Sequence, residues 1–212
     1  ISVVADLNVA IDYIAENISY KHLNNDIKEP LNNPYKKNHT GLSLRILYEK
    51  ITDILQDADK IQTAAEIIRQ GGLVAFPTET VYGLGADALN ANASAKIYAA
   101  KGRPSDNPLI VHIATYSDME KIAKKMPPQA KLLSDAFWPG PLTMIVEKNE
   151  KVPYETTGGM DTVAIRMPSH PVALALIRES GGYIAAPSAN TSGKPSPTLA
   201  EHVARDLAGK IP

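Results

Sequence analysis

The pattern of apolar and polar positions divides the chain into a weakly patterned start and a regular remainder. Apolar side chains at helical spacing predict an amphipathic helix over residues 5–18. Residues 21–40 contain five Asn and two Pro with few apolar residues, which predicts a linker or a loop. The alternation at residues 42–46 fits a strand, whereas the isoleucine spacing over residues 46–54 fits the start of a helix equally well.

From residue 59 onward, helical and strand patterns alternate. Asp59, with Gln62 three residues later, predicts a capping box at the start of a helix that Gly71 and Gly72 end. Further helices are predicted over residues 92–100, 117–126, 129–137, 172–179 and 199–206, the last capped by Thr198. Short buried strands are predicted over residues 73–76, 108–112, 144–147, 163–167 and 183–186. This alternation with short connections indicates a layered α/β domain.

Polar side chains gather where the predicted strands end. The strand over residues 73–76 is followed at once by hydroxyl and carboxylate groups in residues 78–82. Gly83 and Gly85 are expected to let the backbone turn sharply or approach a ligand closely. Because ligands of α/β sheets usually lie beyond the carboxyl ends of the strands, we expect these loops to converge on one cavity.

Four charged or titratable side chains stand out as candidate chemistry. Lys101 and Arg103 lie two residues apart on backbone stiffened by two prolines, and an anion is their expected partner. Taken alone, such a pair is more often a surface loop with two solvated cations. His112 ends a predicted strand, and taken alone it is more often a satisfied core histidine than a ligand. Arg166 is the charged residue in an apolar run, and a buried arginine needs a partner.

The composition narrows the classes of function. The chain has 212 residues, a net charge of -1, 44% apolar residues and no cysteine. The lack of cysteine excludes disulfides, thiolate zinc sites and cysteine nucleophiles. The sequence contains neither a GxxxxGK[ST] phosphate loop nor a His/Cys cluster for structural zinc. No apolar run approaches the about 20 residues that cross a bilayer, and no signal peptide is visible, so we expect no membrane contact and a cytoplasmic location.

Five motifs in order resemble one known family. They are PTETVYGLG at 77–85, KxRPxxNPL at 101–109, WPGPLT at 138–143, DTVAIRMP at 161–168 and APSAN at 186–190. Together they are similar to the YrdC-type domain of threonylcarbamoyl-AMP synthases, in the YrdC/YciO family, over about Asp59 to Pro212. The resemblance implies an α/β protein with a three-layer YrdC-like fold, in which helices flank a twisted mixed β-sheet.

The same resemblance suggests the domain limits. Residues 1–45 have no counterpart in the family and are expected to be an N-terminal extension or linker. Residues 46–212 are expected to form the YrdC-like domain. The family domain normally continues past the position of Pro212 into further strands, one of which carries an arginine near the nucleotide. We therefore expect the domain to be truncated at its C-terminal end, without part of the nucleotide site.

The function that the resemblance implies is L-threonylcarbamoyladenylate synthesis. In this reaction ATP, L-threonine and bicarbonate give L-threonylcarbamoyladenylate, pyrophosphate and water, and the product feeds the N6-threonylcarbamoyl modification of tRNA adenosine 37. Magnesium is expected to enter with ATP, held largely by phosphate oxygens and water. Possible further partners are tRNA-modification proteins or tRNA itself.

The resemblance also assigns candidate site residues. The substrates supply their own nucleophile, so the protein should contribute positioning and charge neutralisation, with Lys101 and Arg103 as the catalytic cations. The positions expected to bind ATP are Lys101, Arg103, Asn107, Thr162, Ser188, Asn190 and Ser196. Those expected to bind L-threonine are Thr78, His112, Arg166 and the backbone of Ala186. For three residues an alternative stays open: turn chemistry for Ser196, packing for Tyr82, and capping or pairing with a cation for Glu79.

Two other functions compete with this interpretation. One is a nucleic-acid-binding module for double-stranded RNA or tRNA, although the near-zero net charge and 6% aromatic residues offer few stacking platforms. The other is the carbamoyl-adenylate-forming domain of a hydrogenase-maturation carbamoyltransferase. In that family the domain follows cysteine-rich zinc modules, and this chain has no cysteine.

Overall fold

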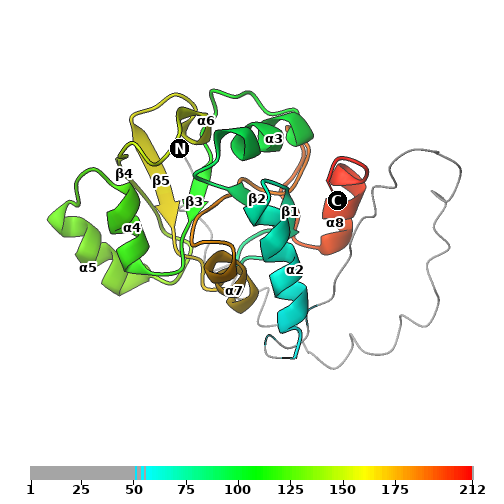
Figure 1. Cartoon of the computed structure of the whole chain (residues 1–212), viewed down its shortest axis with the longest axis horizontal. Helices are drawn as coiled ribbons and strands as arrows, with labels where there is room; N and C mark the ends of the chain where they lie inside the picture. The colour runs from blue at the N-terminus through cyan, green and yellow to red at the C-terminus, as the bar shows by residue number, and fades with distance from the viewer. Residues whose placement is uncertain (1–50, 52–53, 55, 212) are drawn as a thin grey trace, which may run out of the picture. The chain divides into compact units, whose positions relative to one another are not determined.

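A mixed six-stranded sheet with the order β1-β2-β6-β3-β5-β4 lies at the centre of the described part of the protein (Figure 1). The structure is a computed structural model and describes residue 51, residue 54 and residues 56–211. Only β3 and β5 are parallel neighbours, and the other adjacent pairs are antiparallel. The strands are β1 (Val74–Phe76), β2 (Gly83–Asp87), β3 (Ile110–His112), β4 (Thr143–Glu147), β5 (Thr162–Arg166) and β6 (Ile184–Ala185).

Helices cover both faces of this sheet. They are α2 (Ala58–Arg69), α3 (Ala91–Lys101), α4 (Tyr116–Ile122), α5 (Pro128–Phe137), α6 (Tyr154–Thr157), α7 (Pro171–Glu179) and α8 (Ala200–Leu207). All of these helices lie in one compact unit of the chain, Leu44–Pro212. The predicted helix over residues 5–18, the linker over 21–40 and the element over 42–46 lie outside the described residues.

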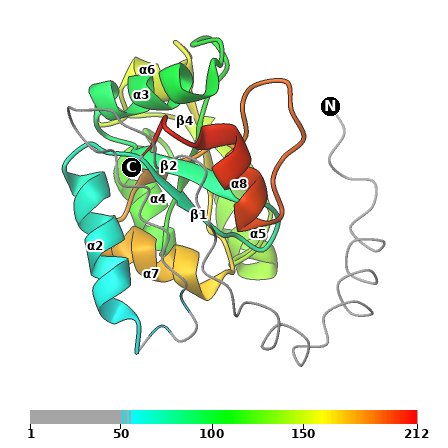
Figure 2. The ribbon, with the colours of Figure 1, turned by 90° about the vertical axis from the view of Figure 1, so that its right-hand side faces the viewer.

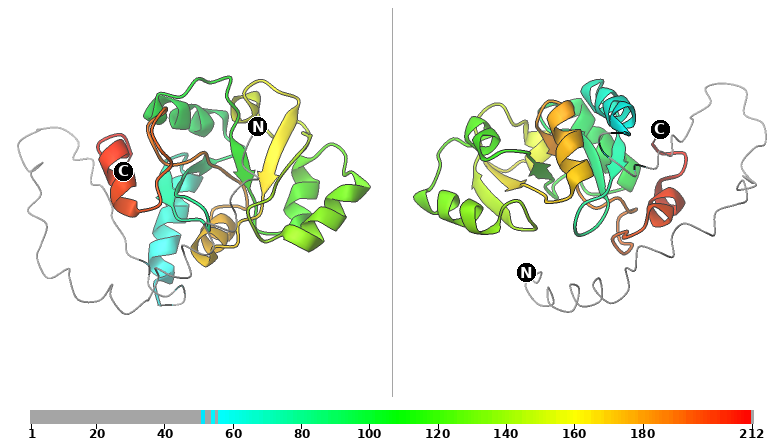
Figure 3. Two further views of the ribbon diagram at one scale, coloured as in Figure 1. Left: turned by 180° about the vertical axis from the view of Figure 1, so that it is seen from behind. Right: turned by 90° about the horizontal axis from the view of Figure 1, so that it is seen from below.

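Two apolar clusters fill the spaces on either side of the sheet. Helices α2 and α7 lie side by side (Figure 3) and bury Ile68 and Ile177 against Phe76 and Ile184. The other cluster joins α3, α4, α5 and α8 to the opposite face of the sheet. Figure 2 shows α2 and α8 on either side of β1. The expectation of a three-layer α/β fold is therefore confirmed.

Strand β2 is an element that the sequence analysis took for a loop. Leu84 and Ala86 alternate with glycines, and their side chains belong to the cluster of α3 and α8. Gly85 faces the opposite side, where an added Cβ would lie 2.7 Å from Phe76 Cε1 and 2.7 Å from Ile184 Cγ2. Gly85 is thus required for close packing between the sheet and Phe76, which differs from the predicted approach to a ligand.

Replacing Gly85 with alanine is expected to lower the free energy of unfolding by about 1–3 kcal/mol, because the new methyl group overpacks a filled core. Gly83→Ala in the same strand is the matched control, since its added Cβ would lie 3.3 Å from the nearest atom, Phe76 Cζ. Urea denaturation of both variants measures the difference. Equal losses of stability in the two variants would show that Phe76 and Ile184 move to accommodate the new methyl group at little cost.

Three predicted helix ends are wrong. Helix α2 begins at Ala58, so Asp59 lies inside its first turn and makes no capping box. Helix α8 begins at Ala200, and Thr198 does not cap it. Helix α4 ends at Ile122, four residues before the predicted Met126, because Ala123 turns to extended backbone and pairs with the segment after β4. The short helix α6 was not predicted at all.

Candidate functional site

Arg166 pairs with an acidic side chain from the loop after β1. Along β5, Val163 and Ile165 belong to the cluster of α3 and α8, so the alternation of a strand places Arg166 on the opposite face. Arg166 Nη2 donates to Glu79 Oε1 at 2.7 Å and to Thr80 Oγ1 at 3.1 Å. The prediction that Arg166 needs a partner is confirmed, and of the alternatives for Glu79 the structure shows the ion pair.

The electrostatics of this pair keep Glu79 ionised. Burial raises the pKa of the Glu79 carboxyl, but the Arg166 guanidinium and nearby backbone N–H groups outweigh burial and hold that pKa below its usual range. The Arg166 side chain is 11% exposed and that of Glu79 is 19% exposed. Arg166 and Glu79 therefore form a largely buried, charged pair at the surface of the sheet.

His112 is the neighbour of Arg166 across the parallel strands β3 and β5. Its side chain is 4% exposed, its Nδ1 lies 3.2 Å from the Ile110 carbonyl oxygen, and its ring meets the edge of Phe76 at 6.1 Å between centroids. Burial, followed by the charge of Arg166, lowers the pKa of His112 to about 4. His112 is therefore neutral at pH 7 and could meet a ligand only as an uncharged hydrogen-bonding group.

Thr78 organises the turn that carries Glu79 and Thr80. Its Oγ1 donates to the Val81 carbonyl at 2.6 Å and accepts from the backbone N–H groups of Thr80 and Val81, each at 3.2 Å. A hydroxyl that closes such a turn fixes the backbone that follows it. The role of Thr78 as a threonine ligand stays a prediction.

Lys101 is buried at the end of α3 and joins that helix to the loop after β6. It is 1% exposed, and its Nζ donates to the backbone carbonyls of Ser188 and Asn190. In the other direction, the Ser192 N–H donates to the Lys101 carbonyl at 2.8 Å. Burial, followed by the charge of Arg103, lowers the pKa of Lys101 to about 8. The alternative of a solvated surface cation is wrong for Lys101.

Arg103 is held by its own loop. Its Nη2 donates to Asn107 Oδ1 at 2.6 Å and to the Pro108 carbonyl at 3.2 Å, and its Nε donates to the Asn107 carbonyl at 3.2 Å. Burial lowers the pKa of Arg103 from its usual range. Lys101, which lies two residues before Arg103, contacts the backbone of the loop that carries Ser188 and Asn190, so the chain joins these two segments at Lys101.

Among the remaining predicted residues, only Ala186 shares a hydrogen-bond partner with the residues above, the Ile110 carbonyl that also lies beside His112 Nδ1. Thr162 starts β5 and Arg166 ends it, so about 13 Å of strand separates them. Ser196 is exposed in the loop before α8. The Ala186 N–H donates to the Ile110 carbonyl at 2.9 Å, and its side chain is buried. The ligand roles of Thr162, Ser196 and Ala186 stay predictions.

The mixed sheet corrects the expectation that every site loop leaves the carboxyl end of a strand. Strand β6 runs antiparallel to β3, so the loop that carries Ser188 and Asn190 leaves the sheet beside the amino end of β3. The loop over residues 102–109 enters β3 at that same end. Lys101 therefore lies between the loop that follows β6 and the loop that precedes β3.

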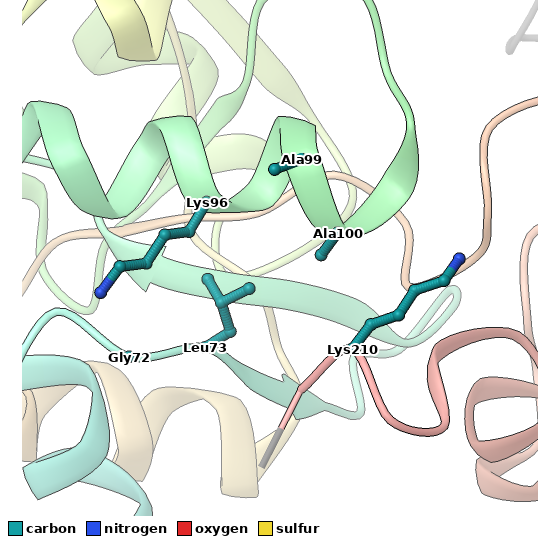
Figure 4. A pocket seen from close by; sticks show the side chains of 6 residues that line it. All are labelled: Gly72, Leu73, Lys96, Ala99, Ala100 and Lys210. Carbon is teal, nitrogen blue, oxygen red and sulfur yellow. The ribbon is translucent and has the colours of Figure 1, made fainter.

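Two cavities lie in the described residues, and their linings differ from the predicted site. The larger, of 470 Å³, is lined by Gly72, Leu73, Lys96, Ala99, Ala100 and Lys210. Figure 4 shows the amino groups of Lys96 and Lys210 pointing away from each other, so they do not converge on one ligand. The other, of 420 Å³, is lined by residues around Lys148 and Tyr154. Neither cavity is lined by a predicted site residue, so the expected single cavity is not among these two.

Within residue 51, residue 54 and residues 56–211, no group of three or more His, Cys, Asp or Glu side chains could hold a metal ion. Over the same residues, no helix is long and apolar enough to cross a membrane.

The sequence analysis left the role of Glu79 open and assigned no role to Thr80. Both contact Arg166, and the signal was an acidic residue between two hydroxyls directly after a buried strand. The alternative that Glu79 pairs with a cation named the interaction but not the partner, because the two residues lie 87 positions apart.

The fold and these contacts define a mixed α/β domain with two buried cationic centres, Lys101 and Arg166. A model of the Sua5/YciO/YrdC family, described as telomere recombination, matches residues 66–212. The chain belongs to this family, and the resemblance found in the sequence is confirmed.

Two similar proteins are named threonylcarbamoyl-AMP synthase. That of Pyrococcus abyssi is 62% identical over 152 residues, which cover 72% of this chain and 45% of the relative. That of Bacillus subtilis is 61% identical over 163 residues, which cover 76% of this chain and 47% of the relative. The crystal structure of P. abyssi Sua5 complexed with L-threonine matches with a TM-score of 0.71 and 61% identity, over 72% of this chain and 45% of that one. The chain thus spans about half the length of the relatives that it matches.

Proposed function

We propose that this domain synthesises L-threonylcarbamoyladenylate from ATP, L-threonine and bicarbonate, with release of pyrophosphate and water. The observation that carries the proposal is the family match, since residues 66–212 include every predicted site residue. The relatives at 61–62% identity are named for this activity, and the P. abyssi structure contains L-threonine.

The chemistry fits the two cationic centres. The threonine amino group captures bicarbonate as a carbamate, and a carbamate oxygen attacks the α-phosphate of ATP, so the protein needs no nucleophile of its own. Lys101 and Arg103 would neutralise the phosphates, and Arg166 would hold the amino-acid carboxylate. Magnesium would enter in complex with ATP, with phosphate oxygens and water as its main ligands, and would offset phosphate charge. We assign the activity to the cytoplasm and its product to tRNA-modification proteins that act on tRNA.

Pyrophosphate release from ATP tests the proposal. We expect release that requires both L-threonine and bicarbonate. Release without threonine dependence would contradict the synthase function. A further assay, with carbamoyl phosphate in place of threonine and bicarbonate, tests the carbamoyl-adenylate alternative. That alternative predicts pyrophosphate release in this assay alone.

The affinity for ATP is expected to fall at high pH. Lys101 loses its proton in the folded, ligand-free protein as the pH rises through about 8, against an ordinary value of 10.5. Above that pH, the dissociation constant of a non-hydrolysable ATP analogue should rise about tenfold per pH unit, because binding must first restore the charge. Calorimetry without threonine, between pH 7 and pH 10, measures this.

The control for the pH dependence is Lys101→Met, which should bind weakly at every pH with a nearly flat profile. A wild-type profile that is equally flat would show that the charge of Lys101 does not contribute to binding of the triphosphate.

A further inference from the structure

The ion pair between Glu79 and Arg166 leaves one buried atom of each side chain without a hydrogen-bond partner. Glu79 Oε1 accepts from Arg166 Nη2, but Glu79 Oε2 and Arg166 Nε are buried and have no hydrogen-bond partner among the described residues. The backbone N–H groups of Glu79 and Ser169 lower the pKa of this carboxyl but do not complete a hydrogen bond to Oε2. Buried polar atoms without partners are uncommon, because water no longer compensates for the missing bond. Here two such atoms belong to one pair, and this calls for a physical explanation.

The two unpaired atoms have opposite hydrogen-bonding character. Glu79 Oε2 is an acceptor on a carboxylate, and Arg166 Nε carries a donor hydrogen on a guanidinium. An α-amino acid offers the complement of both, a donating ammonium next to an accepting carboxylate. The hydroxyls of Thr78 and Thr80 lie 3.1 Å apart beside this pair, and Thr80 Oγ1 already contacts Arg166.

We propose that Glu79 binds the α-amino group of the amino-acid substrate while Arg166 binds its carboxylate. This inference rests on the proposed function, because it takes the amino acid to be the one consumed in the reaction. It adds to that function a residue that determines specificity. Glu79 would select zwitterionic amino acids over other small carboxylates.

The selection follows from charge. Arg166 alone would attract any small carboxylate, since a guanidinium binds carboxylates by two parallel hydrogen bonds. Glu79 stays ionised beside it and repels a carboxylate that has no ammonium group, which is an unfavourable element directed against the wrong ligand. The other titratable groups that interact with Glu79 are His112 and His170, and burial lowers the pKa of each. Neither histidine therefore supplies a competing positive charge at neutral pH.

Comparing two ligands that differ only in the amino group tests this role. L-threonine and its deaminated analogue, (R)-3-hydroxybutyrate, are titrated calorimetrically into the wild type, Glu79→Gln and the matched control Glu155→Gln, whose carboxylate is exposed on α6. Glu79→Gln keeps an oxygen that accepts from Arg166 but removes the charge. Its affinity for L-threonine should fall about 10- to 100-fold, as for loss of a charge-assisted hydrogen bond, while its affinity for hydroxybutyrate stays equal or rises.

Other outcomes overturn the inference. An equal change for both ligands would mean that Glu79 only supports the fold around Arg166, and no change for L-threonine would mean that the amino group is bound elsewhere. A wild type that binds neither ligand, or binds both equally, also contradicts it. If Glu79→Gln does not fold, Glu79→Asp decides, because the retained charge should retain the preference for L-threonine and its loss would reject the role.

The test separates this inference from the proposed function, because binding is measured without ATP. Intact discrimination by Glu79 together with threonine-independent pyrophosphate release would reject the synthase reaction but leave an amino-acid site. Threonine-dependent pyrophosphate release without discrimination by Glu79 would support the synthase reaction and reject the role of Glu79.

Discussion

Lys101→Ala and Arg103→Ala are each expected to lower kcat/KM for L-threonylcarbamoyladenylate formation by roughly 30- to 1,000-fold. In the proposed site, each variant removes a fixed positive charge that would face the ATP phosphates, and loss of one such preorganised contact costs about 2–4 kcal/mol of transition-state stabilisation. Steady-state pyrophosphate release measures the effect. Lys125→Ala, which removes an exposed lysine before α5, is the matched control and should behave like the wild type.

The two variants should differ in stability. Lys101→Ala leaves the carbonyls of Ser188 and Asn190 without their buried donor, so it should also lower the free energy of unfolding, by about 1–3 kcal/mol for each carbonyl that water does not reach. Arg103→Ala removes contacts of a partly exposed loop and should be tolerated better. Wild-type turnover in both variants would show that the phosphates bind elsewhere.

Protonation of His112 is expected to destabilise the fold in acid. Its pKa is about 4 in the folded protein against an ordinary value of 6.5, so the unfolded chain binds the proton first as the pH falls. The stability that the neutral ring contributes is fully present above pH 6.5 and is lost as the pH falls towards 4. The loss amounts to about 2 kcal/mol by pH 5 and about 3 kcal/mol by pH 4, relative to pH 8.

Urea denaturation between pH 8 and pH 5 measures this contribution by comparison with His112→Gln. Protonation of carboxyl groups with lowered pKa values, such as those of Glu79 and Asp206, also destabilises the fold in acid. The pH dependence of wild-type stability alone therefore does not isolate the contribution of His112. The variant should show a flatter dependence on pH. Parallel curves for the two proteins would mean that His112 titrates normally.

Periodicity predicted the fold where apolar side chains carry the pattern. The alternation in Val163–Arg166 and the helical spacing of Ile61, Ala65 and Ile68 lead directly to β5 and to the buried face of α2. Strand β2 was not predicted because two of its five residues are glycines. Glycine has no side chain, so the close packing at Gly85 adds nothing to the alternation of apolar residues in the sequence. The end of α4 was misplaced because the pairing of Ala123 with the segment after β4 outweighs the local helical pattern.

The candidate site was predictable in its chemistry but not in its contacts. The residue types and motifs named Lys101, Arg103, Asn107 and Arg166 without any coordinates. Their partners depend on which strands become neighbours, and the sequence does not encode that locally. Lys101 contacts backbone carbonyls 87 and 89 positions away. A motif of side chains cannot predict such a contact, because every residue has a carbonyl group.

The donation of Lys101 to two backbone carbonyls limits what this residue can offer a ligand. A protonated lysine has three hydrogens, and the chain itself engages two of them. A triphosphate would therefore meet one free N–H at this amine, a single contact that attracts phosphate without fixing its orientation. The Arg103 guanidinium likewise donates three of its five N–H groups to Asn107 and Pro108. In the proposed reaction, the two remaining N–H groups, both on Nη1, would therefore have to orient the α-phosphate.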